Sequence, residues 1–367
     1  MRFRYSAEEN GVLVKKALVY TQDEHKINYH DVDSHAVYIT ERLQASGYET
    51  YIVGGAVRDL ILGKKPKDFD IVTAASPPRI KKVFRNARII GRRFRLVHVF
   101  FGSKIIEVST FRSTKDGHTG NTFGTIEEDV LRRDFSVNAL FYDPLKQLVI
   151  DYVGGMKDIR KGVIRPLIPL THIFTDDPVR IIRAVKYAAL AGFKLPFSLK
   201  RMIHKHSSLL ADVSPSRLTE EIFKIIYSSN ALEIVKALIK FNIYIYLQPE
   251  AVKLFNTLPC FKEKYLKSIA ALGREGFKNS IGEALSSLVR DYLEETVDWD
   301  GSQGIAELYR NAFILARKFV LPMNPPRVEL DHALKIIFAE RGLHVKRTRF
   351  SGYNHKKSND GAVAAEN

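Results

Sequence analysis

The chain has 367 residues, of which 45% are hydrophobic and 27% are charged. These proportions are typical of a globular protein and exclude a largely disordered chain, and the length predicts two or three domains. Lys and Arg outnumber Asp and Glu by 57 to 41, and the resulting net charge of +16 indicates a polyanionic partner, either nucleic acid or an anionic membrane surface.

The sequence also limits the compartment in which we expect the protein to work. Its single cysteine, Cys260, excludes an intrachain disulfide and a cysteine-cluster zinc site, and it fits a reducing compartment. No apolar run approaches the roughly 18–20 residues of a membrane span, and the first residues show no hydrophobic stretch typical of a signal peptide. We therefore expect a soluble, cytoplasmic protein.

Residues 1–34 are polar and weakly patterned, so we expect an N-terminal segment without a site. Nothing downstream completes a metal ligand set with the HDVDSH stretch, which favours a solvated segment or a helix start over a metal site. The helical spacing of apolar residues predicts a helix over 35–46, and Gly47 ends it.

Residues 48–165 alternate short apolar strands with short helices, which predicts a mixed α/β domain. Ser76 and the two prolines after it are typical of a helix N-terminus. The turn at Gly102 and Ser103 is short enough to join two strands into a hairpin. The predicted strands are 51–53, 69–72, 94–101 and 105–111, and the predicted helices are 56–62 and 77–84.

From about residue 172 the pattern becomes helical and stays so to residue 345. Helices are predicted over 178–191, ended by Gly192, and over 215–228. The final residues are polar and poor in apolar side chains, which is typical of a disordered tail. We therefore divide the chain into 1–34 (N-terminal segment), 35–168 (α/β head), 169–230 (helical neck), 231–345 (helical body) and 346–367 (basic tail).

Three carboxylates in the head suggest a metal site. Asp68 and Asp70 flank Phe69, and residues two apart in a strand face the same side with Cα atoms roughly 6.5–7 Å apart. Glu107 lies in an apolar strand, where burying a carboxylate is costly unless it is paired or bound to metal. Together the three suit a pair of Mg²⁺ or Mn²⁺ ions. The alternatives are a solvated Asp-x-Asp loop and an edge strand with Glu107 facing water.

A phosphate-binding turn is predicted between the first strand and the first helix of the mixed domain. Gly54 and Gly55 allow a ligand to approach the backbone, the next helix offers free N–H groups, and Arg58 follows one turn later. The chain contains no GxxxxGK[ST] loop and no GxGxxG after a strand, which argues against a P-loop NTPase and a dinucleotide-binding fold.

Two basic runs, 79–95 and 341–357, contain no acidic residue. Such runs are hard to explain as solvated surface alone, and we expect them to bind nucleic acid phosphates. Aromatic residues in the second run suit stacking on single-stranded bases, whereas a flexible solubilising tail is the alternative. The candidate contacts are Arg92, Arg93, Arg95, Lys346, Arg347 and Arg349.

Two further motifs combine charges with a helix. RRDFSVN at 132–138 contains either a structural salt bridge or a triphosphate clamp. DDPVRIIR at 176–183 places a carboxylate and arginines on one helical face, where they form either an ion pair or an acceptor-plus-donor pair for a base edge. The candidates are Arg132, Arg133, Asp134, Asn138, Asp177, Arg180 and Arg183.

The order of these motifs resembles that of the class II tRNA nucleotidyltransferases and bacterial poly(A) polymerases. The resemblance extends from Tyr48 to Leu218 through GGAVRDLILG, KDFDIVT, IIEVSTFR, RRDFSVNALFYD, DYVGGMKDIRKGVIR and DDPVRIIRAVKYA. RIIGRRFRLVHVFFG resembles the segment that marks bacterial poly(A) polymerases, as distinct from CCA-adding enzymes. Asp176 departs from the pattern, because the family usually has Glu there.

The resemblance implies a catalytic α/β nucleotidyltransferase head with a small mixed sheet, followed by an all-α neck and body and a basic C-terminal tail. The neck (169–230) would bind nucleotide and RNA, and the body (231–345) would bind RNA. It implies template-independent addition of AMP from ATP to the 3′ ends of RNA (mRNA, tRNA or small RNAs), with Mg²⁺ or Mn²⁺ as the cofactor. By position, the catalytic residues would be Asp68, Asp70, Glu107 and Asp134, with the first three holding metal, and the nucleotide-binding residues Gly54, Gly55, Arg58, Arg132, Arg133, Asn138, Asp177, Arg180 and Arg183.

Two other functions remain open on the sequence. A CCA-adding enzyme has the same fold and chemistry but stops after three nucleotides on tRNA. A non-catalytic RNA-binding protein of the same fold is disfavoured, because it would gain nothing from three acids facing polyanionic RNA. A membrane-surface protein finds no support, since the chain shows no long basic amphipathic helix.

Overall fold

A computed structural model describes residues 2–7, 13–91, 96–113, 115, 122–272, 280–301 and 303–345. The chain forms two compact units, Met1–Phe277 with Leu321–Asn324, and Lys278–Val320 with Pro325–Asn367. In the described part of the chain, every helix is too short or too polar to cross a membrane.

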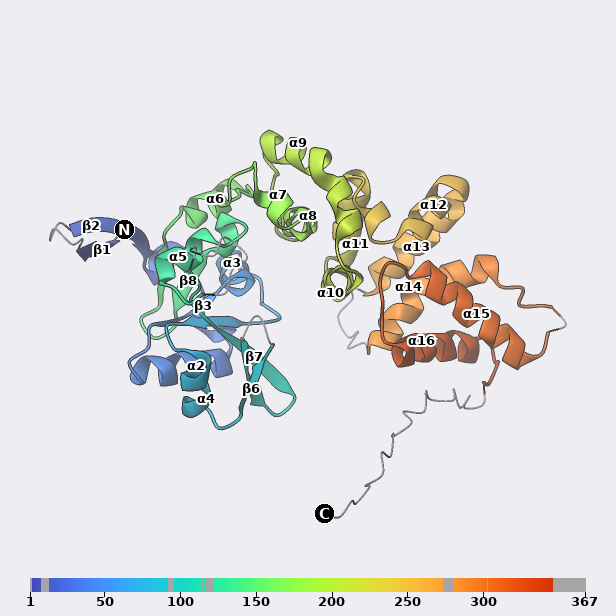
Figure 1. Ribbon diagram of the computed structural model, residues 1–367, viewed down its shortest axis with the longest axis horizontal. Coiled ribbons are helices and arrows are strands. Elements are labelled where there is room, and N and C mark those ends of the chain that lie inside the picture. Colours follow the sequence, from blue (N-terminus) through green and yellow to red (C-terminus); the bar gives the residue numbers. More distant parts are fainter. Residues whose placement is uncertain are drawn as a thin grey trace, which may run out of the picture. The chain divides into compact units, whose positions relative to one another are not determined.

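Within the described residues, a nine-stranded mixed sheet organises the N-terminal part of the first unit (Figure 1). The strand order is β1-β2-β9-β8-β3-β4-β7-β6-β5, in which β4 and β7 run parallel and the other neighbouring pairs run antiparallel. The strands are β1 Arg2–Ala7, β2 Leu13–Tyr20, β3 Thr50–Val53, β4 Asp70–Thr73, β5 Ala87–Ile90, β6 Leu96–Phe101, β7 Lys104–Thr110, β8 Leu140–Asp143 and β9 Leu148–Asp151.

Short helices cover the central strands, whose residues are buried throughout β3 and β8. The helix α2 begins with Asp33 as its N-cap, whose carboxylate accepts hydrogen bonds from the N–H groups of His35 and Ala36, so the HDVDSH stretch is a helix start. Helices α2 and α4 contact each other and lie over strands β3 to β6 (Figure 1). The helices up to the neck are α1 Gln22–His25, α2 Ser34–Ala45, α3 Gly55–Ile61, α4 Pro77–Val83, α5 Ile126–Leu131 and α6 Gly155–Lys161.

Residues 1–34 contribute two strands, β1 and β2, that the sequence pattern did not predict and that extend the sheet. Leu18 pairs with Asp151, so β2 continues the antiparallel ladder beyond β9. This pairing buries Ala17 and Tyr20, although the adjacent Lys15 and Lys16 interrupt the apolar pattern in the sequence. The strands β5, β8 and β9 also lacked a predicted counterpart, whereas the hairpin at Gly102 is confirmed.

Helices form the rest of the first unit, in agreement with the predicted change of pattern. Gly192 ends α8 in the left-handed conformation, with φ of 72°, as expected for a C-terminal glycine. These helices are α7 Ile173–Asp176, α8 Val179–Ala191, α9 Phe197–His206, α10 Pro215–Ile226, α11 Ala231–Lys240, α12 Pro249–Thr257 and α13 Pro259–Leu272.

The second unit is helical in its described part. Tyr292 and Phe319 stack with ring centroids 4.3 Å apart, and Phe338 packs against Tyr309, so aromatic side chains from all three helices build its core. The helices are α14 Ile281–Thr296, α15 Ile305–Phe319 and α16 Arg327–Glu340.

Candidate active site

The parallel pair β4 and β7 places Asp70 directly beside Glu107. Asp70 is the first residue of β4, and Asp68 lies just before the strand rather than in it, which corrects the expected strand boundary. The predicted alternation nevertheless holds, because Phe69 is buried and the aspartates on both sides of it are exposed. The two aspartates and Glu107 therefore belong to one edge of the sheet.

The electrostatics of this edge favour a bound cation. Neighbouring protein atoms partly desolvate the Asp70 carboxylate, and the negative charge of Glu107 repels it. Together these effects raise the pKa of Asp70 to about 6. The positive charge of Arg133 lowers the pKa of Asp70, but by less than desolvation and Glu107 raise it. A cation placed here would relieve the repulsion between the carboxylates.

The donor set suits a hard divalent cation that keeps ligands from water and substrate. In the part of the chain that the structure describes, the carboxylates of Asp68 and Asp70 form no hydrogen bond or ion pair with protein. Oε2 of Glu107 lies 3.7 Å from Nε2 of His98. Among the described residues, no group of three acidic, histidine or cysteine side chains is placed to hold a metal by itself. Mg²⁺ commonly binds through one or two carboxylates together with water and phosphate oxygens, and this arrangement fits that pattern.

The turn between β3 and α3 approaches the same edge. Val53 pairs with Asp70, and the next residue, Gly54, has φ of 75° and ψ of −139°. A Cβ atom at Gly54 would lie 3.8 Å from Oδ2 of Asp70. The turn therefore needs glycine for its backbone conformation, and it leaves room beside the carboxylate.

Arg58 does not face solvent, although the sequence suggested a phosphate contact. Its side chain is 2% exposed and donates hydrogen bonds to Oδ1 of Asp59 and, at 2.8 Å, to Oδ1 of Asn138. Its guanidinium also lies 5.3 Å from the ring centre of Tyr187 on α8. In this structure Arg58 and Asn138 join α3 to neighbouring elements.

The two arginines after α5 differ in their surroundings. Arg132 is buried and donates a 2.8 Å hydrogen bond to the carbonyl of Ser113. Arg133 is partly exposed and donates two hydrogen bonds to Oδ2 of Asp129, the shorter at 2.8 Å. Only Arg133 of these two retains access to solvent near Asp70.

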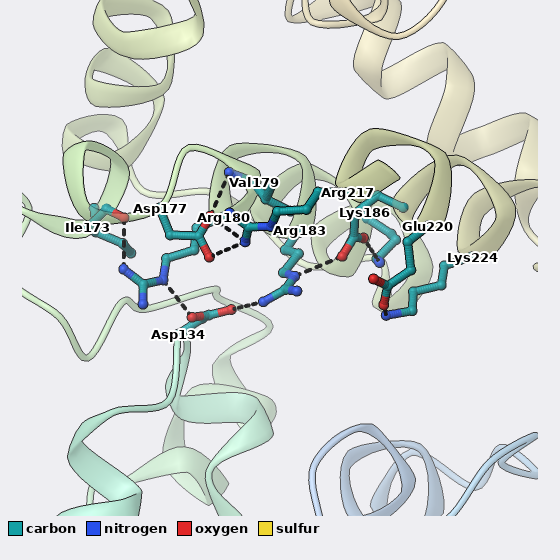
Figure 2. A network of polar contacts seen from close by, with 11 residues as sticks. Asp134, Ile173, Asp177, Val179, Arg180, Arg183, Lys186, Arg217, Glu220 and Lys224 are labelled. Carbon is teal, nitrogen blue, oxygen red and sulfur yellow. Dashed lines mark hydrogen bonds and ion pairs between the residues drawn. The ribbon is translucent and has the colours of Figure 1, made fainter. Parts of the chain in front are cut away.

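Asp134 lies between two arginines of α8 (Figure 2). Its Oδ1 accepts a 2.8 Å hydrogen bond from Nε of Arg180, and its Oδ2 accepts one of 3.1 Å from Arg183. Arg180 also donates to the carbonyl of Ile173 and is almost completely buried. The carboxylate of Asp134 therefore orients the two arginines and connects the strand-rich part of the unit to its helices.

Two helices of the neck complete this network (Figure 2). Both oxygens of Asp177 accept 2.8 Å hydrogen bonds from Arg217 on α10. Glu221, one turn later on α10, accepts hydrogen bonds from Arg183 and Lys186. Burial alone would raise the pKa of Glu221, but Lys186 and Arg183 lower it to about 2.

The sequence did not single out Arg217, Glu221 or Lys186. Arg217 lies 40 positions from Asp177, and Glu221 is adjacent to the exposed Glu220, which looks the same in the sequence. Only the packing of α10 against α8 distinguishes them. The predicted RNA contacts Arg92, Arg93, Arg95, Lys346, Arg347 and Arg349 lie outside the described residues.

Two family models match the chain. Residues 50–165 match the poly(A) polymerase head domain, and residues 192–254 match a domain described as the probable RNA- and SrmB-binding site of polymerase A. The head model covers the carboxylates, the glycine turn and Asp134.

Curated relatives include poly(A) polymerase I of Escherichia coli O157:H7, with 41% identity over 266 residues, which is 68% of this chain and 57% of the relative. The CC-adding tRNA nucleotidyltransferase of Halalkalibacterium halodurans is 38% identical over 200 residues, covering 54% of this chain and 50% of the relative. The chain thus spans about half the length of these relatives.

Solved structures share the fold. The CCA-adding enzyme of Bacillus stearothermophilus in complex with CTP superposes with a TM-score of 0.55 and 26% identity, covering 83% of this chain and 82% of that chain. A tRNA nucleotidyltransferase with a primer tRNA and an ATP analogue has a TM-score of 0.53 and 24% identity, covering 83% of this chain and 98% of that one. Through its head and the helices that follow, the chain belongs to the family of class II tRNA nucleotidyltransferases and bacterial poly(A) polymerases.

Proposed function

We propose that the protein is a template-independent polynucleotide adenylyltransferase, which adds AMP from ATP to RNA 3′ ends in the cytoplasm. The observation that carries this choice is the 41% identity over 266 residues to poly(A) polymerase I, compared with 38% over 200 residues to the CC-adding enzyme. The exposed and unpartnered pair Asp68 and Asp70 in the described structure supports an enzyme over a passive RNA binder.

In the proposed reaction, the 3′-hydroxyl of RNA attacks the α-phosphorus of ATP in line with the departing pyrophosphate. Asp68, Asp70 and Glu107, together with water and phosphate oxygens, would hold the two divalent metal ions. When bound, these ions would lower the pKa of the attacking hydroxyl and neutralise phosphate charge. The backbone at Gly54 leaves room for a ligand beside Asp70, and Arg133 offers a partly exposed positive charge near the same carboxylate. No covalent intermediate on the protein is required.

Base selection is assigned to Asp177, Arg180 and Arg183. Asp134 and the carbonyl of Ile173 fix the guanidinium of Arg180, so its remaining N–H groups keep one orientation. A donor held in this way can discriminate among bases because a poorly matched base leaves buried polar groups unpaired. Arg58 and Asn138 then act as residues that position α3 and the 3₁₀ helix Ser136–Asn138, because they hydrogen-bond to each other. Arg132 positions the backbone at Ser113.

The second candidate is CCA addition to tRNA. The solved structure at 26% identity and a TM-score of 0.55 is a CCA-adding enzyme, which favours this candidate more than the sequence relatives do. Both candidates use the same carboxylates, so the nucleotide and the product length must separate them.

The test is incubation of the purified protein with a 5′-labelled RNA, Mg²⁺ and each NTP separately, with a tRNA that lacks its CCA end in parallel. We expect extended tails with ATP alone on the generic RNA. Products that require CTP and stop at three added nucleotides on tRNA alone would replace this function by CCA addition. Retained RNA binding without any product would identify a non-catalytic binder.

A further inference from the structure

A basic groove lies between α9 and the C-terminal end of α11. Its volume is about 660 Å³, and we refer to it as the α9 groove. Helix α9 buries Leu199 and Ile203 against the rest of the unit, so its other face is turned to solvent. The groove contains the residues Phe197, Lys200, Arg201, His204, Lys205, Lys240 and Phe241.

The cations of the α9 groove are exposed and have no acidic neighbour in the sequence. Residues 178–211 contain no Asp or Glu, although they contribute seven Lys and Arg. In the described structure, the side chains of Lys200, Arg201, Lys205 and Lys240 form no ion pair or hydrogen bond with protein. Like charges held this close are destabilising in the absence of a counterion, so the arrangement favours a polyanionic ligand.

Phe197 adds a feature that electrostatics alone does not explain. It is the first residue of α9 and its side chain is 82% exposed, the largest exposure among the described large apolar residues. Phe241 lies half-buried at the end of α11 on the other side of the groove. An exposed aromatic ring beside unpaired cations is the combination that single-stranded nucleic acids use, with bases on the ring and phosphates on the cations.

We propose that the α9 groove binds single-stranded RNA, with phosphates on Lys200, Arg201 and Lys205 and one base stacked on Phe197. This inference rests on the proposed function. The groove lies within residues 192–254, which match a domain described as a probable RNA-binding site, and the inference goes beyond that match by assigning the phosphate and base contacts to particular side chains. The groove contains no described acidic side chain that would favour one base over another. Stacking and phosphate contacts tolerate any sequence, as a growing tail requires.

The test measures binding of a fluorescent RNA of about 20 nucleotides by anisotropy over a range of salt concentrations, without ATP. We expect the triple variant Lys200→Ala, Arg201→Ala, Lys205→Ala to bind more weakly. The slope of log affinity against log salt should become shallower by about 2, since each phosphate contact contributes about 0.7. Lys157→Ala, an exposed lysine of α6 outside the groove, is the control and should leave the slope unchanged.

A second pair of variants tests stacking without a change of charge. Phe197→Ala should weaken binding about tenfold, and Phe197→Trp should restore it, because the larger ring preserves the stacking surface. Circular dichroism and thermal unfolding of each variant confirm that the fold is kept. Equal salt slopes for the triple variant and the unchanged protein, or equal affinity for Phe197→Ala and Phe197→Trp, would overturn the proposal.

The design separates this inference from the proposed function. AMP addition to a saturating primer of about four nucleotides reports on the active site and should be unchanged in the groove variants. A protein that adds no AMP but loses RNA affinity in these variants would retain the groove and refute only the enzymatic function. A protein that adds AMP normally and binds RNA equally well in the groove variants would support the enzymatic function and refute the groove.

Discussion

Asp68 and Asp70 stand out among the side chains of the site because the described protein gives them no partner. The chain has 57 Lys and Arg residues, so an ion pair for each carboxylate is readily available. Asp134 and Glu221, by comparison, are each held by two cationic side chains. Leaving two adjacent carboxylates unpaired beside Glu107 is unfavourable for the apo protein and becomes favourable once a divalent cation is present.

Asp70→Asn should therefore reduce AMP addition by about a thousandfold or more, because it removes a charged metal ligand and several kcal/mol of transition-state stabilisation. Single-turnover extension of a labelled RNA at saturating Mg²⁺ measures the loss. Asp212→Asn, an exposed carboxylate of the same unit, is the control. RNA affinity should stay the same or increase, since a negative charge has been removed. Near-normal extension by a well-folded Asp70→Asn protein would contradict the metal assignment.

At the level of elements, the segment between α3 and β4 is attached to the neck at two points. Nζ of Lys64 donates a 2.8 Å hydrogen bond to the carbonyl of Leu190 near the end of α8, and Nζ of Lys67 donates to the carbonyl of Tyr227, the C-cap of α10. Carbonyls in the last turn of a helix lack intrahelical partners and attract cations. These contacts hold the segment that leads directly into Asp68.

The double variant Lys64→Gln, Lys67→Gln should lower the turnover number several-fold with little change in KM for ATP, because it loosens Asp68 without removing a ligand. Lys65→Gln removes one positive charge from an exposed lysine of this segment that has no described partner, and it serves as the control. Steady-state kinetics with all three proteins decides the point. Equal turnover in the double variant and the control would show that the attachment has no catalytic role.

Local signals in the sequence were sufficient for many element boundaries. Gly47 and Gly192 follow their helices as predicted, and the prolines after Ser76 begin α4. The strand β2 escaped prediction because it pairs with β9, more than a hundred residues away, and β1 escaped with it because β1 pairs with β2. Secondary structure that depends on distant pairing has no local signature.

The candidate site shows the same difference between local signals, which the sequence contains, and distant contacts, which it does not show. Asp70 and Glu107 could be chosen from the strand pattern, and the parallel register places them side by side. The orientation of Arg180 depends on Asp134, 46 positions away, and the face of α9 that carries Phe197 becomes visible only when Leu199 and Ile203 are seen to be buried. Residue types were thus predictable, whereas their partners required the packed structure.

For the molecule as a whole, Glu221 should make the free energy of unfolding depend on pH. Its pKa of about 2 in the folded protein lies below the ordinary value, so its contribution is complete above the unfolded pKa and is lost as the pH falls toward 2. Glu221→Gln should lower the free energy of unfolding by about 3 kcal/mol at neutral pH, because Lys186 and Arg183 then lose a buried partner. Urea unfolding at several pH values should show this difference shrink below about pH 4.

Glu220→Gln provides the control for this prediction. Glu220 is 64% exposed and pairs with the exposed Lys224, so its removal should cost less than about 1 kcal/mol at any pH. A stability difference for Glu221→Gln that matched that of Glu220→Gln, or that grew in acid, would contradict the assigned role of the buried cluster.

The order of strands in the sheet also affects how the protein folds during synthesis on the ribosome. Leu18 pairs with Asp151, so 133 further residues must be synthesised after Leu18 before β2 can pair with β9. At about 5–20 residues per second, this delay is roughly 7–27 seconds. During that time β2 presents an unpaired backbone edge, which is a template for wrong pairing with another nascent chain. Completion of β9 therefore covers this edge of β2, and β1 and β5 remain as the edge strands of the finished sheet.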